Sequence, residues 1–175
     1  MFELAALGLL QQEPLHGYRL KQQLEMFMSS CISVNYGTIY PLLKRLEQRG
    51  AIVVVGDGVS NRKMYSLTEK GRALWLKKMM EHPQESWVNA RSRFMIKLFF
   101  FSYLEPEQRL KLLEIRLRAC QLRLAEQETM PGPEDCYQSY LWDNCSSVLG
   151  GEIAWLKQIF QQEQEQQAAA ALSAF

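Results

Sequence analysis

The stretch Asn35–Gly71, NYGTIYPLLKRLEQRGAIVVVGDGVSNRKMYSLTEKG, decides the fold, because the spacing of its apolar residues changes partway along it. From Ile39 to Leu46 the apolar residues recur every three or four positions, which predicts an amphipathic helix. Asn35 is a good N-cap for this helix, and Gly50 is a residue type at which helices commonly end. Such a helix turns one apolar face to a core and leaves the opposite face for other contacts.

Beyond Gly50 the pattern becomes that of strands. The run Ile52–Val55 is short and β-branched, and Arg62–Leu67 alternates between two faces. Gly56–Gly58 supplies a turn between them, and Thr68 suits the N-cap of a further helix. These residues predict a two-stranded hairpin followed by a helix.

Two short helices are predicted upstream, over Glu3–Gln11 and Gly17–Met28, because apolar residues lie on one face of each. The order helix, helix, helix, hairpin, helix is the outline of a winged helix-turn-helix. The predicted fold class is therefore mainly α with a small β-hairpin. An N-terminal winged helix-turn-helix domain over residues 1–81 precedes an all-helical C-terminal dimerisation arm.

The segment His82–Val88 has one proline and little periodicity, and it marks the expected boundary between the two parts. From Asn89 onward only helices are predicted, over residues 89–103, 107–128 and 135–166. Residues 89–166 are expected to form a helical dimerisation domain. The Gln-, Glu- and Ala-rich end has no apolar stripe to bury, so residues 167–175 are expected to be either frayed helix or a flexible tail.

Leucines in the second of these C-terminal helices step by three and four residues, as they do where the helices of a coiled coil meet. A long arm with such a seam carries apolar surface that one chain cannot bury, so a homodimer is expected. The residues assigned to dimerisation are Leu110, Leu113, Leu117, Leu124, Trp155 and Ile159.

The formal net charge of +1 is unevenly divided, with a net of +5 over residues 1–78 and −4 over the remainder. A basic first part suits a polyanionic partner such as double-stranded DNA. An enzyme is disfavoured, because the chain has two histidines, no phosphate-binding glycine loop and no clustered metal ligands. No catalytic residue, cofactor or metal is therefore expected.

The four cysteines lack the spacing of a metal site, no export leader is evident, and no apolar run approaches the ~20 residues that span a bilayer. We therefore expect a cytoplasmic protein with reduced thiols and no membrane contact.

Three motifs, LHGY at 15–18, YGTIYPLLKRLE at 36–47 and YSLT at 65–68, together closely resemble the bacterial PadR-type transcription regulators. The resemblance continues at Gly50, Arg62 and Gly71. The C-terminal half is similar, in helix pattern and at Trp155, to the helical dimerisation domain of larger members of the AphA kind. The resemblance implies a homodimer that represses, or less often activates, nearby genes. In some members control by a small aromatic or cationic ligand is implied.

A helix beginning near Asn35 fits the DNA major groove with its N-terminal residues closest to the base edges. Lysine and arginine farther along it, and on the hairpin, would neutralise phosphates and supply affinity that falls with salt. The residues expected to contact DNA are Asn35, Tyr36, Thr38, Tyr40, Lys44, Arg45, Asn61, Arg62 and Lys63.

Several alternatives stay open at this point. Tyr18 is assigned to packing between helices rather than to base reading, and Tyr40 is either core or a DNA contact. A winged helix also serves as a protein–protein adaptor without DNA binding, although the divided charge and basic hairpin favour DNA. A set of aromatic and methionine residues either belongs to the core or lines a pocket for a small planar aromatic effector: Trp75, Trp87, Trp142, Trp155, Met79 and Met80.

Overall fold

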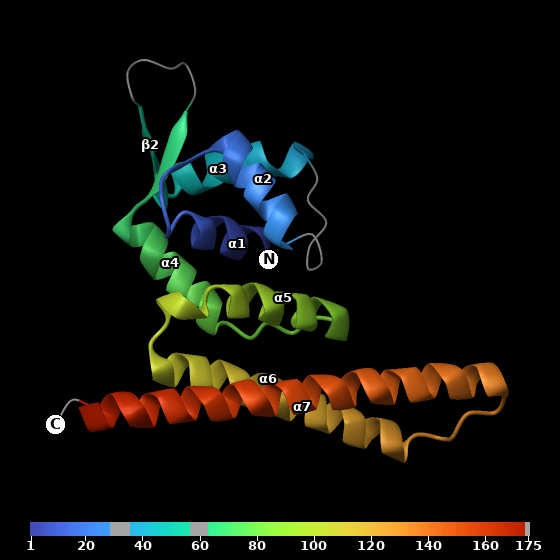
Figure 1. The fold of residues 1–175 in the computed structure, drawn as a ribbon. Coiled ribbons are helices and arrows are strands. Elements are labelled where there is room, and N and C mark those ends of the chain that lie inside the picture. Colours follow the sequence, from blue (N-terminus) through green and yellow to red (C-terminus); the bar gives the residue numbers. More distant parts are fainter. Residues whose placement is uncertain (29–35, 57–62, 174–175) are drawn as a thin grey trace. The chain divides into compact units, whose positions relative to one another are not determined.

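The computed structural model describes residues 1–28, 36–56 and 63–173 (Figure 1). The chain divides into two compact units, Met1–Ser102 and Tyr103–Phe175. The helix that follows the expected boundary segment therefore groups with the first unit, whereas the sequence pattern placed residues 89 onward in the helical arm.

The first unit has the elements of a winged helix, which confirms the predicted fold class. The third helix and the two strands of the hairpin start or end within a few residues of the predicted positions. The elements are α1 (Phe2–Leu9), β1 (Leu15–His16), α2 (Gly17–Met28), α3 (Tyr36–Gln48), β2 (Ile52–Val55), β3 (Met64–Leu67), α4 (Glu69–Met80), α5 (Trp87–Phe99) and the 3-10 turn η1 (Phe101–Tyr103).

Among the described residues the sheet has three antiparallel strands in the order β1-β3-β2, rather than the two of the predicted hairpin. Leu15 of β1 and Val54 of β2 both pair with Tyr65 of β3. The missed strand β1 is two residues long, too short to show the alternation by which strands are predicted. Its pairing ties the start of α2 to the base of the wing.

The junction of α3, β2 and α4 is held by contacts of Thr68 and two glycines. Gly50 ends α3 with φ of +69°, a conformation that L side chains rarely adopt. The Thr68 hydroxyl donates to the Gly50 carbonyl at 2.7 Å and accepts from the Gly71 N–H at 3.0 Å, so Thr68 is the predicted N-cap. A Cβ at Gly71 would lie 2.0 Å from the Ala51 carbonyl oxygen, which requires glycine there.

The core of the first unit takes up the apolar faces of α1, α2 and α3. Ile39, Leu43 and Leu46 of α3 are at most 1% exposed. Phe100 is fully buried and packs against α1 so closely that a Cβ at Gly8 would lie 2.5 Å from its ring. Because the apolar face of α3 is buried in this core, its polar face is exposed to solvent or to a partner.

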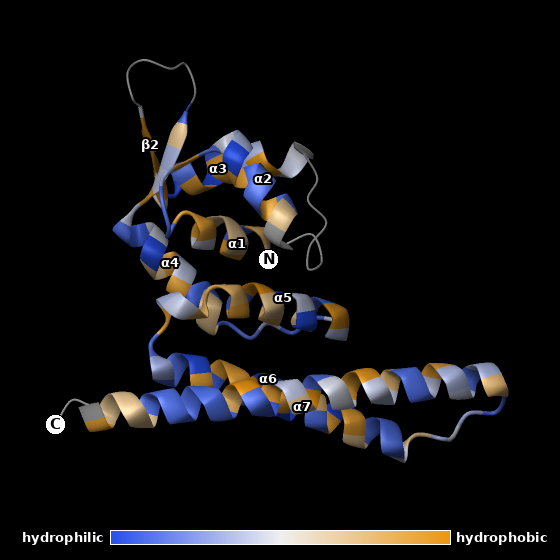
Figure 2. Ribbon diagram, viewed as in Figure 1, coloured by the Kyte–Doolittle hydropathy of each residue, from blue (hydrophilic) through white to orange (hydrophobic). Residues whose placement is uncertain are grey.

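The second unit is an antiparallel hairpin of α6 (Pro106–Thr129) and α7 (Cys136–Ser173), with apolar and polar residues interspersed along both helices (Figure 2). A buried ion pair crosses it, in which Arg116 donates from Nε and Nη2 to Glu152 Oε1 at 2.9 and 2.7 Å. Arg109 pairs with Glu163 at 2.7 Å farther along. Helix α7 continues through Ser173, so residues 167–173 are helical.

Candidate nucleic-acid interface

The outward face of α3 carries the predicted contact residues that the structure describes. Thr38, Tyr40, Lys44 and Arg45 are exposed. Tyr40 is 59% exposed, which settles the choice between core and surface in favour of surface. Asn35, Asn61, Arg62 and the side chain of Tyr36 lie outside the described residues. Lys63 precedes β3 and is exposed.

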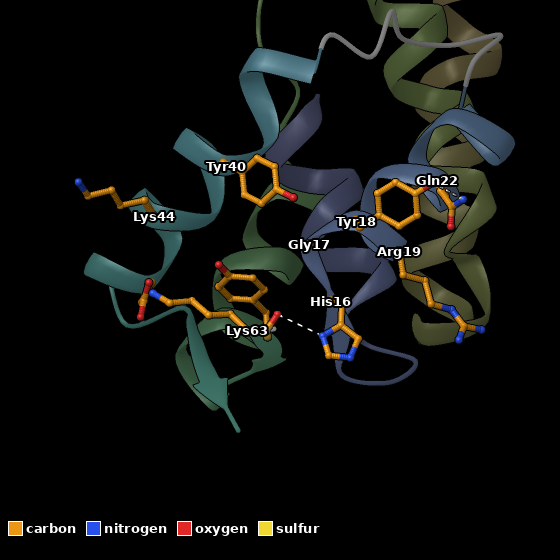
Figure 3. Close-up of a pocket in the computed structure, with 10 residues that line it drawn as sticks. His16, Gly17, Tyr18, Arg19, Gln22, Tyr40, Lys44 and Lys63 are labelled. Carbon is orange, nitrogen blue, oxygen red and sulfur yellow. Dashed lines mark hydrogen bonds between the residues drawn. The ribbon is translucent and has the colours of Figure 1, made fainter. Parts of the chain in front are cut away.

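A groove of about 1070 Å³ lies beside this face and is open to solvent. Its walls come from the end of β1, the first turns of α2, the outward face of α3 and the start of β3 (Figure 3). The residues that line it are His16, Gly17, Tyr18, Arg19, Gln22, Tyr40, Lys44, Glu47, Lys63 and Tyr65. The groove therefore brings Lys44 and Lys63, which the sequence predicted as DNA contacts, together with residues of α2 that the sequence did not predict.

The groove is predominantly basic, since Arg19, Lys44 and Lys63 line it together with one carboxylate, Glu47. In Figure 3 Lys44 and Arg19 extend on opposite sides, with the rings of Tyr40 and Tyr18 between them. A surface of this composition favours an anionic partner.

Tyr65 and His16 line the buried floor and the wing side of the groove. Tyr65 is 7% exposed, and burial, reinforced by the Glu47 carboxylate, raises the pKa of its phenol, so it stays neutral at physiological pH. His16 Nδ1 lies 3.3 Å from the Lys63 carbonyl oxygen and donates to it in the tautomer protonated at that nitrogen. This bond adds a side-chain link to the β1–β3 pairing at the base of the wing.

Tyr18 does not have the buried packing role assigned to it from the sequence. Its side chain is 62% exposed, and its hydroxyl accepts a hydrogen bond from Gln22 Nε2 at 3.2 Å. Packing between α2 and α3 is made instead at Gly17, where a Cβ would lie 3.1 Å from Tyr40 Cε1 and 3.3 Å from Leu43 Cδ1. The close approach of the two helices leaves Tyr18 on the surface.

The sequence analysis missed Arg19, Gln22 and His16 as groove residues. The available signal was local: His16 lies within the LHGY motif, Arg19 directly follows it, and Gln22 lies one helical turn after Tyr18. The spacing does not reveal the groove itself, because it depends on β1 pairing with β3 across 50 residues of sequence.

The predicted dimerisation residues divide between buried and half-buried positions. Leu113 is 0% exposed within one chain, whereas the other members of the set are half-buried: Leu110, Leu117, Leu124, Trp155 and Ile159. Helix α7 also presents Tyr137, Leu141 and Val148, which are 78%, 66% and 51% exposed. These three residues lie on the same helix face as Trp155 and Ile159, at spacings of four, seven, seven and four. We call these five residues the α7 stripe.

The aromatic and methionine residues considered as an effector pocket are partly core. Trp75 and Met79 are 3% and 0% exposed, and the Trp75 ring meets Phe100 edge-on at 6.3 Å. Trp87, Trp142 and Trp155 are half-buried. Within residues 1–28, 36–56 and 63–173, no group of three or more His, Cys, Asp or Glu side chains is placed to hold a metal ion. No helix in that part of the chain is both long and apolar enough to cross a membrane.

Comparison with known proteins gives matches to transcription regulators. Residues 6–77 match the transcriptional regulator PadR-like family. The negative transcriptional regulator PadR of Bacillus subtilis (strain 168) is 28% identical over 128 residues, which cover 70% of this chain and 68% of that protein.

Solved structures are also similar to this chain. The crystal structure of Bacillus subtilis PadR in complex with operator DNA is 24% identical, with 92% of this chain and 98% of that chain covered and a TM-score of 0.44. The PadR-like transcriptional regulator from Bacillus cereus is 22% identical, with 95% and 99% covered and a TM-score of 0.44.

Proposed function

The chain carries a PadR-like transcriptional-regulator domain in residues 6–77, and on that premise we propose that it is a homodimeric, sequence-specific repressor that binds an inverted repeat in double-stranded DNA. The observation that carries the proposal is the division of α3 into two faces. One face is buried in the core, and the other presents Tyr40, Lys44 and Arg45 beside a basic groove.

Recognition divides between the two kinds of exposed group. The N-terminal part of α3, with Thr38 and Tyr40, enters the major groove, where hydroxyl groups and aromatic edges meet base edges. Lys44 and Lys63 pair with backbone phosphates and supply salt-dependent affinity without sequence preference. Specificity therefore depends on the start of α3, and affinity depends on the surrounding cations.

The homodimer is supported by the α7 stripe. From Tyr137 to Ile159 it extends over 23 residues, roughly 33 Å along the helix axis. Three of its members are more than half exposed in the single chain. An apolar stripe of that length is a liability on a monomer and a suitable surface for a second copy. A two-fold dimer would read two half-sites about one DNA turn, or a multiple of it, apart.

Repression follows from occupancy, because a dimer bound across a promoter excludes polymerase from it. The relative in Bacillus subtilis is named as a negative regulator, which supports the same direction here. We further propose a small aromatic effector, sensed by one or more of the half-buried indoles of Trp87, Trp142 and Trp155. Quenching of tryptophan fluorescence by candidate aromatic acids, with parallel loss of DNA binding, tests this part. Quenching without any change in DNA binding would contradict it.

Selection of bound duplexes from a randomised DNA pool by the purified protein, at near-physiological salt, tests the main proposal. Recovery of an inverted repeat is expected, and its half-site spacing gives the separation of the two α3 helices. Recovery of no motif, with weak and fully salt-sensitive binding, would contradict sequence-specific recognition and favour a protein–protein adaptor.

A further inference from the structure

We propose that His16 is a positioning residue for the wing, which β2 and β3 form, and that it acts through the hydrogen bond between its imidazole Nδ1 and the Lys63 carbonyl. The inference rests on the proposed function and deepens it, because it names what sets the place of the wing relative to α3. His16 itself makes no contact with DNA in this role.

The first argument is the place where the strand pairing stops. Among the described residues, the pairs at the wing end of the two ladders join His16 of β1 and Val55 of β2 to Met64 of β3. Lys63 is the residue immediately before β3. The His16 ring nitrogen lies 3.3 Å from the carbonyl oxygen of Lys63, so the side chain extends the attachment of β1 one residue beyond the backbone pairs (Figure 3).

The second argument is the short path from His16 to the recognition helix. Gly17 follows His16 directly, and a Cβ at Gly17 would lie 3.1 Å from Tyr40 Cε1 and 3.3 Å from Leu43 Cδ1. The start of α2 is therefore packed tightly on α3 and has little freedom to move against it. Because His16 joins this fixed point to the Lys63 carbonyl, a single side chain connects the wing to α3.

The third argument is what stands at the attached point. Lys63 is exposed, and it lines the groove together with Lys44 of α3. Two cations from different elements meet the phosphates of one duplex together only when the elements keep a fixed distance. Ordering a free wing at the moment of binding costs conformational entropy, so a wing that is held in place beforehand binds more tightly.

The fourth argument is the chemistry of the side chain. The bond needs a donor at Nδ1, because a carbonyl oxygen only accepts. A neutral imidazole carries its proton on one nitrogen, and a hydrogen bond of this kind selects the tautomer protonated at Nδ1. Asparagine carries its amide nitrogen at the corresponding place in the side chain, whereas the amide nitrogen of glutamine corresponds to Nε2. The two amides therefore distinguish this bond from a general need for a polar residue.

The test uses the full-length protein and the duplex obtained by selection. His16→Leu is expected to weaken binding about fivefold, because the hydrogen bond is lost and the wing is less well fixed. His16→Asn is expected to stay within about twofold of the unaltered protein, and His16→Gln is expected to bind as weakly as His16→Leu.

Urea unfolding of the three variants is measured alongside, because asparagine is also favoured at the N-cap position, which residue 16 occupies before α2. Affinities that followed the free energies of unfolding, and not the position of the amide nitrogen, would overturn the inference.

A double-variant cycle shows whether His16 acts through the wing. In the Lys63→Ala protein, His16→Leu is expected to have little further effect, because the cation that His16 places is already absent. Lys44 lines the same groove from α3, so Lys44→Ala is the matched control background, in which His16→Leu is expected to keep its full effect. Equal effects in the two backgrounds would overturn the inference, because a general loss of stability acts alike in both.

Nitrogen NMR of the protein carrying isotope-labelled histidine tests the bond without DNA. The chain has two histidines, so the ring signals of His16 are those that His16→Asn removes. A neutral ring protonated at Nδ1 is expected, and a ring protonated at Nε2 alone overturns the inference.

The outcomes separate this inference from the proposed function. If the unaltered protein selects no duplex, the proposed function fails and the inference fails with it. If it selects an inverted repeat and His16→Leu binds that duplex as tightly as the unaltered protein does, the inference alone is overturned. Rescue by His16→Asn but not by His16→Gln, with the effect lost in the Lys63→Ala protein, supports it.

Discussion

Lys44 stands one helical turn after Tyr40 on the exposed face of α3, where we expect a cation to strengthen binding to any duplex. Lys97, in contrast, is 3% exposed in α5 and donates to the Glu81 carbonyl at 2.6 Å. The same side chain type therefore stands in two different environments in one domain. The exposed lysine is available to DNA phosphate, and the buried one satisfies a carbonyl at the end of α4 and loses hydration in doing so.

Lys44→Ala is expected to weaken binding of selected and unrelated duplexes by the same factor and to lower the salt slope by about one. The measurement is affinity over a range of salt concentrations for both duplexes. Lys111→Ala, at an exposed lysine of α6, provides the control and is expected to leave both quantities unchanged. An unaltered slope for Lys44→Ala would remove this residue from the set of phosphate contacts.

The stability of the first unit is expected to depend on pH through Lys97. Burial, assisted by the Arg93 guanidinium, lowers the pKa of Lys97 to about 8, against about 10.4 in an unfolded chain. Between these values the unfolded chain holds more protons than the folded protein. The free energy of unfolding should therefore rise from about pH 8 to pH 10, by on the order of 2 kcal/mol from this group.

Urea unfolding of the unaltered protein and of Lys97→Met at pH 7.5 and pH 10, at one protomer concentration, checks this dependence. Relative to Lys97→Met, the unaltered protein should be more stable at pH 10 than at pH 7.5. Only the unaltered protein loses a buried positive charge as the pH rises. Parallel pH profiles would show that Lys97 keeps its ordinary pKa in the folded state.

At the level of elements, the turns and caps were predictable from sequence because they are local. Thr68 caps α4 through an N–H three residues away, which is visible in the sequence as a residue type in a definite place. Strand β1 was not predictable, since its two residues become a strand only by pairing with Met64 and Tyr65. The groove depends on that pairing, so its residues on α2 were missed.

The α6–α7 hairpin shows a second limit of prediction from local sequence pattern. The three-and-four spacing predicted an apolar face on α6, but spacing alone does not say which helix covers it. Leu113 is fully buried within the single chain, so a substitution such as Leu113→Glu would unfold the hairpin and would not test dimerisation specifically. The α7 stripe, which keeps large exposed fractions, is the better place to test for a partner.

The buried pair Arg116–Glu152 is expected to set the pairing of α6 with α7 more than to add stability. Glu152→Ala removes the carboxylate that faces a buried guanidinium and should lower the free energy of unfolding by about 3 kcal/mol. The double variant Arg116→Leu, Glu152→Leu should recover most of that loss, because two apolar residues avoid the cost of desolvating two charges.

Urea unfolding of the variants at one protomer concentration measures these differences. Glu114→Ala removes an exposed pair with Arg118, whose side chain is 74% exposed, and is expected to change stability by less than about 0.5 kcal/mol. A double variant as unstable as Glu152→Ala would mean that the ion pair itself stabilises the hairpin.

At the level of the whole molecule, the proposed function requires two copies, since one winged helix would cover one half-site. The specificity of a dimer comes from requiring both half-sites at a definite spacing, and its affinity comes from the linkage of two weak contacts. Loss of the dimer should therefore abolish selective binding while leaving weak binding to any DNA.

Leu141 is the central exposed member of the α7 stripe, and Leu141→Glu is expected to give a folded monomer that has lost at least a hundredfold in affinity for the selected duplex. Ser147→Glu places the same charge at an exposed position well around the helix from the stripe, and should remain dimeric. Sedimentation velocity gives the oligomeric state, and circular dichroism shows whether the helices are retained. A Leu141→Glu protein that sediments as a stable dimer would place the interface elsewhere. A charge at the centre of a buried helix–helix contact costs several kcal/mol, so a dimer that formed through the α7 stripe would not survive this substitution. Its survival would mean that the exposed apolar residues of α7 contact some other partner.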